Sequence, residues 1–311
     1  MYLGIDGGGT KTDAAVCDEH GKILSRAIGG GCAFTGQTRE KAEGNLRGAV
    51  EAALAPFDGC KTPLAGVCAG IAGCGLPPVQ ARYQAFLTAL LPAAKQIKTC
   101  SDAINALSAG IGAGDGVIAI AGTGSSVFCR VRGVISRVGG WGYLLGDEGS
   151  GFDLGKRALT AALRAVDGRG EKTALTGALE EHFGVPLSEA VAQIYSGDGK
   201  SMISSCAPIL LACAEAGDGE ALSVLHASAS DLAETIETAL ASCPVKKAVL
   251  TGSVWKNALY LNTVKGMLGD GVQAMRLEAP PVLGALIEAA AMDGADTGEA
   301  FALLASQGLN E

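Results

Sequence analysis

Two stretches of the chain, far apart in the sequence, follow the same pattern of strand, glycine turn and strand. The apolar run Tyr2–Gly7 leads into the turn Gly7-Gly8-Gly9-Thr10, and the run Gly116–Ala121 leads into Gly122-Thr123-Gly124-Ser125. Two more strand-like runs and then helical patterns follow in each stretch, so both open as β-β-β-α. The repeat predicts two related α/β domains with a boundary near Gly110–Gly116.

Strands and helices are expected throughout both halves. Further strands are expected at Asp13–Asp18, Lys22–Ile28, Leu64–Ile71, Ile97–Cys100, Ser126–Arg132, Val134–Val138 and Lys247–Leu250. Helices are expected at Thr38–Leu54, Pro78–Leu91, Glu148–Val166, Thr173–Phe183, Leu187–Tyr195, Ser201–Leu240 and Pro281–Ala291, and others starting at Ser101 or Asp102 and near Val254. No low-complexity linker separates the halves, so a cleft between the two domains is the expected ligand site.

Composition argues against several classes of protein. The 311 residues carry a net charge of −8 without basic runs, which is a poor match for nucleic acid or an anionic membrane. No apolar run reaches the roughly 18 residues of a membrane span, and no signal peptide is recognised before Tyr2. The ten cysteines include no CxxC pair. Most are therefore expected to be small buried thiols in a reducing cytoplasm.

The first glycine turn has the composition of a phosphate-binding loop. Without side chains, Gly8 and Gly9 can bring backbone N–H groups close to a phosphate. Thr10 adds a hydroxyl donor and Lys11 a positive charge, while Asp6 is placed to hold Mg²⁺ through water. The string lacks the GxxxxGK[ST] pattern of a Walker loop, and it is not a dinucleotide-binding turn, because a strand follows it rather than a helix. A hairpin without a ligand is the alternative.

The second turn repeats this design with the four residues Gly122, Thr123, Gly124 and Ser125. Two such loops at the same place in two domains are expected to grip a polyphosphate from both sides. Between them in the sequence, Asp102 stands at a strand-to-helix junction. It can accept a proton from a substrate hydroxyl, or it can serve only as the cap of its helix.

A third glycine-rich stretch, Gly139–Ser150, contains one of the two tryptophans and two carboxylates. Such a loop can wrap a polar ligand, with Asp147 accepting hydrogen bonds from hydroxyl groups. The alternative is a helix N-terminus whose acidic residues complement the helix dipole. Further on, Thr251-Gly252-Ser253 follows a strand and can seat a nucleobase, or it can be an ordinary turn.

Taken together and in this order, these motifs resemble the N-acetylglucosamine kinase branch of the BadF/BadG/BcrA/BcrD ATPase family, within the actin–hexokinase–Hsp70 superfamily. The resemblance runs from Gly4 to about Ala290. The stretch Gly139–Ser150 is similar to the sugar-kinase loop of that branch and is its most specific signature. The two glycine turns are similar to the phosphate loops of the superfamily, and Thr251–Trp255 is similar to its adenosine motif.

The resemblance implies an α/β fold of two RNase H-like domains, of the actin/hexokinase type, around a central cleft. The N-terminal domain would comprise residues 1–112 joined by a C-terminal helix, 283–311, and the C-terminal domain residues 113–282. The activity implied is ATP-dependent phosphorylation of the 6-hydroxyl of an amino sugar such as N-acetylglucosamine, with Mg²⁺. A homodimer is expected from the resemblance alone.

Site residues follow from the same resemblance. Asp102 would be the catalytic base, and Gly252 and Ser253 would bind adenosine. The residues that would contact the sugar are Asp102, Ser126, Gly140, Trp141 and Asp147. The phosphates of ATP would be bound by Gly8, Gly9, Thr10, Lys11, Gly122, Thr123, Gly124 and Ser125, with Asp6 at the metal.

Two departures from the family pattern leave the sugar open. Phe34 and Ser126 stand where relatives often carry asparagine, so glucosamine or N-acetylmuramic acid is an alternative substrate. A rival function is an ATPase that activates a dehydratase or reductase. Such activators resemble this fold but carry a cluster-ligating cysteine, and the stretch at Asp147 has none. A sugar sensor without catalysis is a third possibility.

Overall fold

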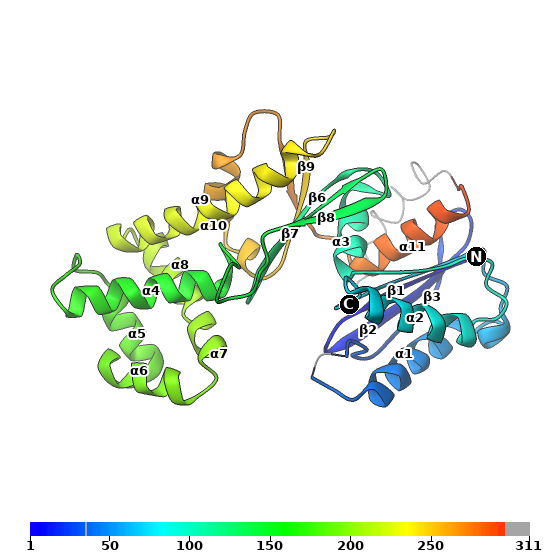
Figure 1. The fold of residues 1–311 in the computed structure, drawn as a ribbon, viewed down its shortest axis with the longest axis horizontal. Coiled ribbons are helices and arrows are strands. Elements are labelled where there is room, and N and C mark those ends of the chain that lie inside the picture. The colour runs from blue at the N-terminus through cyan, green and yellow to red at the C-terminus, as the bar shows by residue number, and fades with distance from the viewer. Residues whose placement is uncertain (35, 296–311) are drawn as a thin grey trace. The chain divides into compact units, whose positions relative to one another are not determined.

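The computed structural model describes residues 1–34 and 36–295. The chain divides into two compact units, Met1–Gly114 with Leu277–Glu311, and Asp115–Arg276. Each unit contains one five-stranded sheet (Figure 1). The expected domain limits, at 112–113 and 282–283, stay a prediction, and residues 296–311 of the expected C-terminal helix lie outside the described residues.

The first sheet joins an antiparallel half to a parallel half. Its strands are β1 (Tyr2–Gly7), β2 (Lys11–Cys17), β3 (Ile23–Gly30), β4 (Gly66–Ile71) and β5 (Ile97–Cys100). They lie in the order β3-β2-β1-β4-β5, with β1 parallel to β4 and β4 parallel to β5. β1, β2 and β3 pair antiparallel through hairpins. The carboxyl ends of β1, β4 and β5 therefore share one edge of the sheet.

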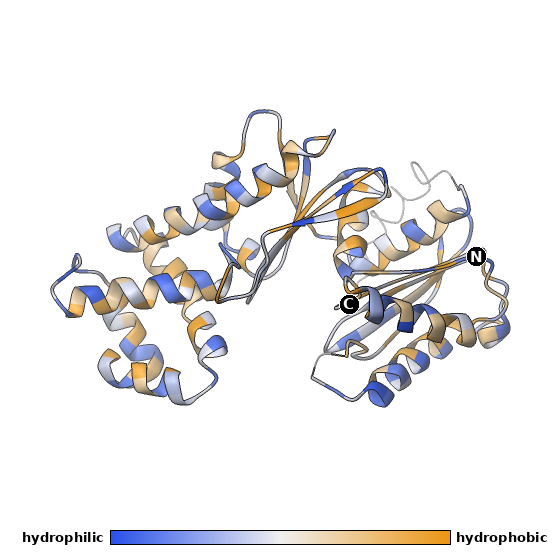
Figure 2. Cartoon of the chain, in the orientation of Figure 1, coloured by the Kyte–Doolittle hydropathy of each residue, from blue (hydrophilic) through white to orange (hydrophobic). Residues whose placement is uncertain are grey.

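Both faces of this sheet are covered. One face packs on α1 (Arg39–Leu54) and α2 (Pro77–Leu90), and the other on α3 (Asp102–Ile111) and α11 (Pro281–Met292), as Figure 1 shows; a short 3-10 helix, η1 (Gly59–Lys61), follows α1. Leu3 and Ile5 point to the first face and Tyr2 to the second, as the period of a strand requires. α11 approaches so closely that a Cβ at Gly4 would lie 2.7 Å from the backbone nitrogen of Leu286. In Figure 2, α1 alternates polar and apolar residues as an amphipathic helix does.

The second sheet repeats the topology of the first. Its strands are β6 (Gly116–Ala121), β7 (Ser125–Val131), β8 (Val134–Val138), β9 (Lys247–Thr251) and β10 (Gln273–Arg276). Their order is β10-β9-β6-β7-β8, the arrangement of the first sheet with each strand replaced by its counterpart. The glycine turn again lies between the first two antiparallel strands. The duplication expected from the sequence is confirmed.

One face of the second sheet packs on a helical layer. The helices of this unit are α4 (Gly151–Val166), α5 (Leu175–Phe183), α6 (Leu187–Ser196), α7 (Gly199–Ser204), α8 (Ala207–Glu215), α9 (Gly219–Ala241), η2 (Val254–Lys256) and α10 (Ala258–Met267). Val117, Ala119 and Val127 of the sheet share one apolar core with them. Trp255 is fully buried in that core, and its indole N–H donates to the carbonyl of Ala119 over 3.1 Å.

The single helix expected at Ser201–Leu240 is wrong, because α7, α8 and α9 occupy that stretch. Pro208 in the first turn of α8 lacks the N–H that a continuous helix would need. Gly217 adopts a left-handed φ of 88°, which ends α8. Asp218 then caps α9 by accepting the N–H of Ala221.

Two other helices begin later than expected, and one strand was not expected. α4 begins at Gly151 rather than Glu148, because Gly149 has a φ of 73° and Ser150 caps the helix. α5 begins at Leu175 rather than Thr173, because Thr173 bonds instead to the carboxylate of Asp218. The unexpected strand, β10, is a short edge strand beside β9.

The ten cysteines are free thiols, and nine of them are buried, which confirms that most are small core residues. None of the helices in the described residues combines the length and apolar character needed to cross a bilayer.

Candidate active site

Two carboxylates lie at the edge of the first sheet where its parallel strands end. Asp6 is the penultimate residue of β1, and Asp102 is the first residue of α3, two residues after the end of β5. Burial raises the pKa of Asp6 to about 6, and the negative charges of Asp102 and Asp13 contribute to the rise. Burial also raises the pKa of Asp102. Two carboxyl groups whose pKa values are raised by burial form a site suited to a cation or a proton.

Ser101, not Asp102, caps α3: its hydroxyl oxygen accepts the N–H of Ala103 over 3.3 Å. The hydroxyl also donates to Asp102 Oδ1 over 3.0 Å. That carboxylate oxygen accepts the N–H of Ala103 as well, over 3.0 Å. The side chain of Asp102 is therefore oriented by its own helix start, while the capping role that the sequence left open for Asp102 falls mainly to its neighbour.

Asn105 is a site residue that the sequence analysis missed. Its side chain is fully buried, and Nδ2 donates to Asp6 Oδ1 over 2.9 Å and to the carbonyl of Ile5 over 3.0 Å. Gly70 makes room for it, since a Cβ there would overlap the amide. The sequence did contain one indication of this role: Asn105 follows Asp102 by three residues on the expected helix, so the two side chains lie close together on one face.

The first glycine turn presents free N–H groups. Gly8 N–H donates to the carbonyl of Lys11 over 2.9 Å, and the carbonyl of Gly8 accepts from Cys32. Within residues 1–34 and 36–295, no protein acceptor receives the N–H of Gly9 or Thr10, and both residues are exposed. Two adjacent free N–H groups beside an exposed lysine are what an anionic oxygen requires.

The second glycine turn is held from behind by α4. The carbonyl of Gly122 accepts the N–H of Gly151 over 2.7 Å, and that of Thr123 accepts the N–H of Phe152 over 3.1 Å. The turn closes through a 2.9 Å bond from Gly122 N–H to the carbonyl of Gly124. No acceptor in the described part of the chain takes the N–H of Thr123 or Gly124. The turn thus repeats the free donors of its counterpart.

A pocket of about 380 Å³ lies within the second unit beside this turn. It is lined by nine residues, of which Gly124, Ser125, Ser126, Gly140 and Asp147 were expected at the site and Ile120, Phe128, Arg137 and Gly142 were not. The pairing of Ile120 with Ser126 and of Phe128 with Arg137 puts these four on one face of the sheet, opposite the helical layer. One pocket therefore combines residues of the second glycine turn with the buried carboxylate of Asp147.

The loop that forms the pocket wall depends on left-handed backbone at several residues. Gly140 has a φ of 67°, and a Cβ there would lie 2.6 Å from Cβ of Ser126. Asp147 has a φ of 60°, which is uncommon outside glycine. Its buried carboxylate accepts the N–H of Gly142 over 3.0 Å. The carboxylate is thereby fixed across the loop with its second oxygen facing Gly124.

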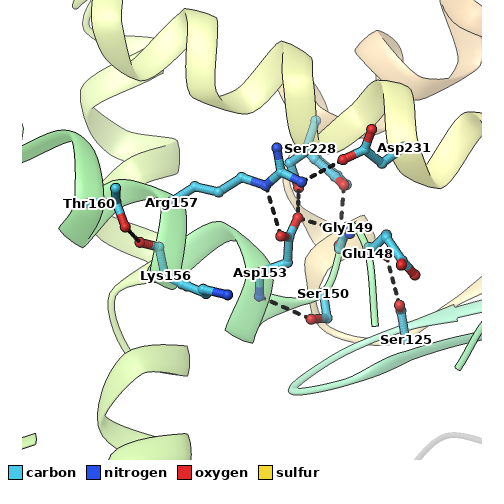
Figure 3. A network of polar contacts seen from close by, with 11 residues as sticks. Ser125, Glu148, Gly149, Ser150, Asp153, Lys156, Arg157, Thr160, Ser228 and Asp231 are labelled. Atoms are coloured by element: carbon cyan, nitrogen blue, oxygen red, sulfur yellow. Dashed lines mark hydrogen bonds and ion pairs between the residues drawn. The ribbon is translucent and has the colours of Figure 1, made fainter. Parts of the chain in front are cut away.

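A partly buried polar network anchors this loop (Figure 3). Asp153 on α4 accepts the N–H of Gly149 over 3.1 Å and the hydroxyl of Ser228 over 2.7 Å, and it pairs with Arg157. Ser125 donates to the carbonyl of Glu148 over 2.7 Å, which ties the loop to the glycine turn. The network keeps the two halves of the pocket in one arrangement.

Of the site residues expected in the second unit, five do not line this pocket: Gly122, Thr123, Trp141, Gly252 and Ser253. Trp141 is 67% exposed, and the guanidinium of Arg137 stacks 4.3 Å from the centre of its ring. Gly252 has a φ of 118° and packs on the carbonyl of Ala121, and the Cβ position of Gly122 lies 3.8 Å from the hydroxyl oxygen of Ser253. The residues expected to bind adenosine therefore adjoin the second glycine turn.

Phe34, one of the two departures expected from the family pattern, stacks on Tyr83 with 4.5 Å between ring centres. It packs against the core of the first unit instead of presenting an amide.

Two sheets of this strand order, each with a glycine turn between its first two strands, define the fold of the actin–hexokinase superfamily. The chain belongs to the BadF/BadG/BcrA/BcrD ATPase family, whose model matches residues 3–289. Membership of this ATPase family means that ATP is the nucleotide used.

Relatives with named activities are similar over most of the chain. An N-acetylmuramic acid/N-acetylglucosamine kinase from Clostridium acetobutylicum is 32% identical over 83% of this chain and 87% of its own. A glucosamine kinase from Vibrio cholerae is 29% identical over 81% of this chain and 84% of its own. The crystal structure of a candidate N-acetylglucosamine kinase from Chromobacterium violaceum matches with a TM-score of 0.69 and 26% identity, over 92% of this chain and 97% of that one.

Proposed function

We propose that the protein transfers the γ-phosphoryl group of ATP to the 6-hydroxyl of an amino sugar. The observation that carries the proposal is the pocket in which the glycine turn at Gly124 meets the Gly139–Ser150 loop with its fixed carboxylate, Asp147. The named relatives, which are kinases of amino sugars, support the same reading.

The two glycine turns suit the phosphates of ATP. Free N–H groups at Gly9, Thr10, Thr123 and Gly124 can donate to phosphate oxygens, and Lys11 adds a positive charge. Gly8, Gly122 and Ser125 shape the turns, while Gly252 and Ser253 would bind the adenosine. These donors stabilise the charge on the transferred group, which is the main demand of phosphoryl transfer.

The carboxylate pair in the first unit fits Mg²⁺. Asp6 is mostly buried with a raised pKa, Asn105 occupies only its Oδ1, and oxygen ligands of this kind suit the ion. Bound there, directly or through water, Mg²⁺ would neutralise part of the charge of the phosphates. The role of Asn105 is then to hold Asp6 in one orientation.

Asp102 would act as the general base. Its carboxylate takes the proton of the 6-hydroxyl, whose oxygen forms a bond to the γ-phosphorus. The bond from that phosphorus to the β–γ bridging oxygen breaks, and ADP leaves with the electron pair. Asp147, Ser126, Gly140 and Trp141 would position the sugar so that this hydroxyl reaches the phosphorus.

A panel of sugars tests the proposal. We expect ADP release that depends on N-acetylglucosamine, glucosamine or N-acetylmuramic acid and is slow with glucose and without sugar. ADP release that is equally fast without any sugar would contradict the proposal, and would favour an ATPase that drives a partner protein. The panel also ranks the three amino sugars, which differ at positions 2 and 3.

Two expectations about the protein's state belong to the same proposal. We expect a homodimer, which light scattering on the purified chain tests directly. We also expect the enzyme to work in the cytoplasm, where ATP is present and where the ten free thiols stay reduced.

A further inference from the structure

Arg137 enters the pocket from the edge strand β8. It pairs with Phe128 of β7, and Ser126 lies two residues before Phe128 on the same strand. Since side chains two residues apart share a face, Arg137, Phe128 and Ser126 line one side of the pocket together. The guanidinium of Arg137 therefore lies on the same face of the sheet as Phe128, the face that lines the pocket.

Arg137 and Asp147 are the charged side chains among the residues that line the pocket. Asp147 is buried and already fixed by Gly142. Arg137 forms no ion pair with any described residue, and its guanidinium stacks on the ring of Trp141 instead. Stacking holds the plane of the guanidinium and leaves its edge, with paired N–H donors, for an anion. The pocket thus contains an oriented cation without a protein counter-charge among the described residues.

The position of Arg137 along the sheet separates it from the phosphate turn. Phe128, its partner across the strands, lies four residues beyond Gly124, a distance of roughly 13 Å along an extended strand. Ser126, the expected sugar contact, lies between the two. The backbone that carries Arg137 is therefore separated from the turn, and we expect an anion bound by its side chain to belong to the part of the sugar that faces away from the phosphates.

We infer that Arg137 binds a carboxylate carried by the sugar, so that the pocket selects amino sugars with an acidic substituent over neutral ones. A planar carboxylate matches the two parallel N–H donors of a guanidinium. The inference rests on the proposed kinase function and names the substrate class of the same site. N-acetylmuramic acid, whose ether substituent ends in a carboxylate, is the probe for the acidic class, and N-acetylglucosamine is its neutral counterpart.

The test is a comparison of kcat/KM for these two sugars in the wild type, Arg137→Gln and Arg137→Lys. We expect Arg137→Gln to lower kcat/KM for N-acetylmuramic acid on the order of 10- to 100-fold, the effect of removing a hydrogen bond to a charged group. The value for N-acetylglucosamine, which has no carboxylate, should fall several-fold less than the value for N-acetylmuramic acid. Arg137→Lys keeps the positive charge but lacks the two parallel N–H donors, so its kcat/KM for N-acetylmuramic acid should lie between the other two values. Arg47→Gln is the matched control, because Arg47 also stacks on an aromatic ring, that of Phe86, in the first unit.

Equal losses for both sugars would overturn the inference, since Arg137 would then serve the phosphates or a part common to both substrates. Unchanged values for both would overturn it as well. Circular dichroism spectra and thermal melting of the variants show separately whether they are folded. If the wild type phosphorylates no sugar, the proposed function fails, and a binding measurement then tests the role of Arg137 separately.

Trp141 is exposed and Trp255 is buried, so quenching of tryptophan fluorescence by N-acetylmuramic acid reports on the pocket. That quenching should weaken in Arg137→Gln, and equal binding by the variant would overturn the inference.

Discussion

The amide of Asn105 donates to Oδ1 of Asp6 over 2.9 Å and, in the same position, to the backbone carbonyl that precedes Asp6. The amide oxygen is buried without a hydrogen-bond partner in the described residues. A group held in this way has little freedom to move, because α3 and the sheet enclose it. The expected metal ligand is therefore oriented by a residue of the helix that also begins with the expected base.

Replacing Asn105 with alanine should weaken both stability and the use of Mg²⁺. The free energy of unfolding should fall by about 2–4 kcal/mol, because buried acceptors lose their donor and a cavity remains. The Mg²⁺ concentration for half-maximal activity should rise several-fold. Asn45→Ala is the control, since Asn45 also donates to a backbone carbonyl, that of Gly31, but contacts no carboxylate. If both variants need the same Mg²⁺ as the wild type, the orienting role of Asn105 is wrong.

The raised pKa of Asp6 predicts how Asp6→Asn changes stability with pH. In the unfolded chain this carboxyl titrates near 3.8, and in the folded protein at about 6. The folded state therefore holds the proton more tightly, and the free energy of unfolding falls as pH rises from about 4 to above 6.

Asparagine removes this loss, so the stability of the variant relative to the wild type should grow by up to about 3 kcal/mol between pH 4 and 7.5. Denaturant titrations without nucleotide or Mg²⁺ measure the difference. Asp58→Asn, at an exposed position, gives the baseline. A stability difference between Asp6→Asn and the wild type that does not vary with pH would show that burial does not raise the pKa of Asp6.

Asp102→Asn should remove the proposed base with little effect on nucleotide binding. The loss of general-base catalysis predicts a kcat lower by about 10²- to 10⁴-fold. The dissociation constant of ATP, measured by calorimetry, should stay within a few-fold of the wild type. Ser101→Ala removes only the cap and one bond to Asp102, so it should cost about 1 kcal/mol of stability and far less activity. Near-normal turnover by Asp102→Asn would assign the base elsewhere.

Gly140→Ala should damage the sugar pocket specifically. The added methyl group would lie 2.6 Å from Cβ of Ser126, and φ is 67°. We expect the KM for the sugar to rise about 10-fold or more, because a small displacement at the reacting centre is costly.

Gly133→Ala is the matched control for this variant. Gly133 has a φ of 79° in the β7–β8 turn, with open space around its Cβ position. Both variants should lose about 1 kcal/mol of stability from the left-handed backbone. Only the variant at Gly140 should change the KM for the sugar, and an equal change in both would point to a general loosening of the unit.

Much of the fold could be predicted because its central strands are continuous apolar runs. The predictions of Tyr2–Gly7 and Gly116–Ala121 are confirmed residue for residue. Both strands are covered by neighbours on two edges, so their polarity reports burial directly. β10 was missed because this four-residue edge strand is only partly buried. The helix breaks near Pro208 and Gly217 depend on local backbone chemistry that an apolar pattern of helical period hides.

The site could be predicted only where a residue lies in a compact motif. The two glycine turns and Asp147 could be recognised from the residues next to them in the sequence. Arg137 and Phe128 join the pocket through strand register, which no short motif records. Asn105 reaches Asp6 across 99 residues of sequence. Contacts of this kind follow from the tertiary fold and not from local spacing.

The most direct test of the proposed function is product analysis by phosphorus NMR with the amino sugar that releases ADP fastest. The reaction contains ATP, Mg²⁺ and that sugar, and the signals of ADP and of any sugar phosphate are integrated together. We expect one equivalent of 6-phosphorylated amino sugar for each ADP formed, and with Asp102→Asn we expect both products to form at least about 100-fold more slowly. ADP accompanied by inorganic phosphate, with no phosphorylated sugar, would contradict it.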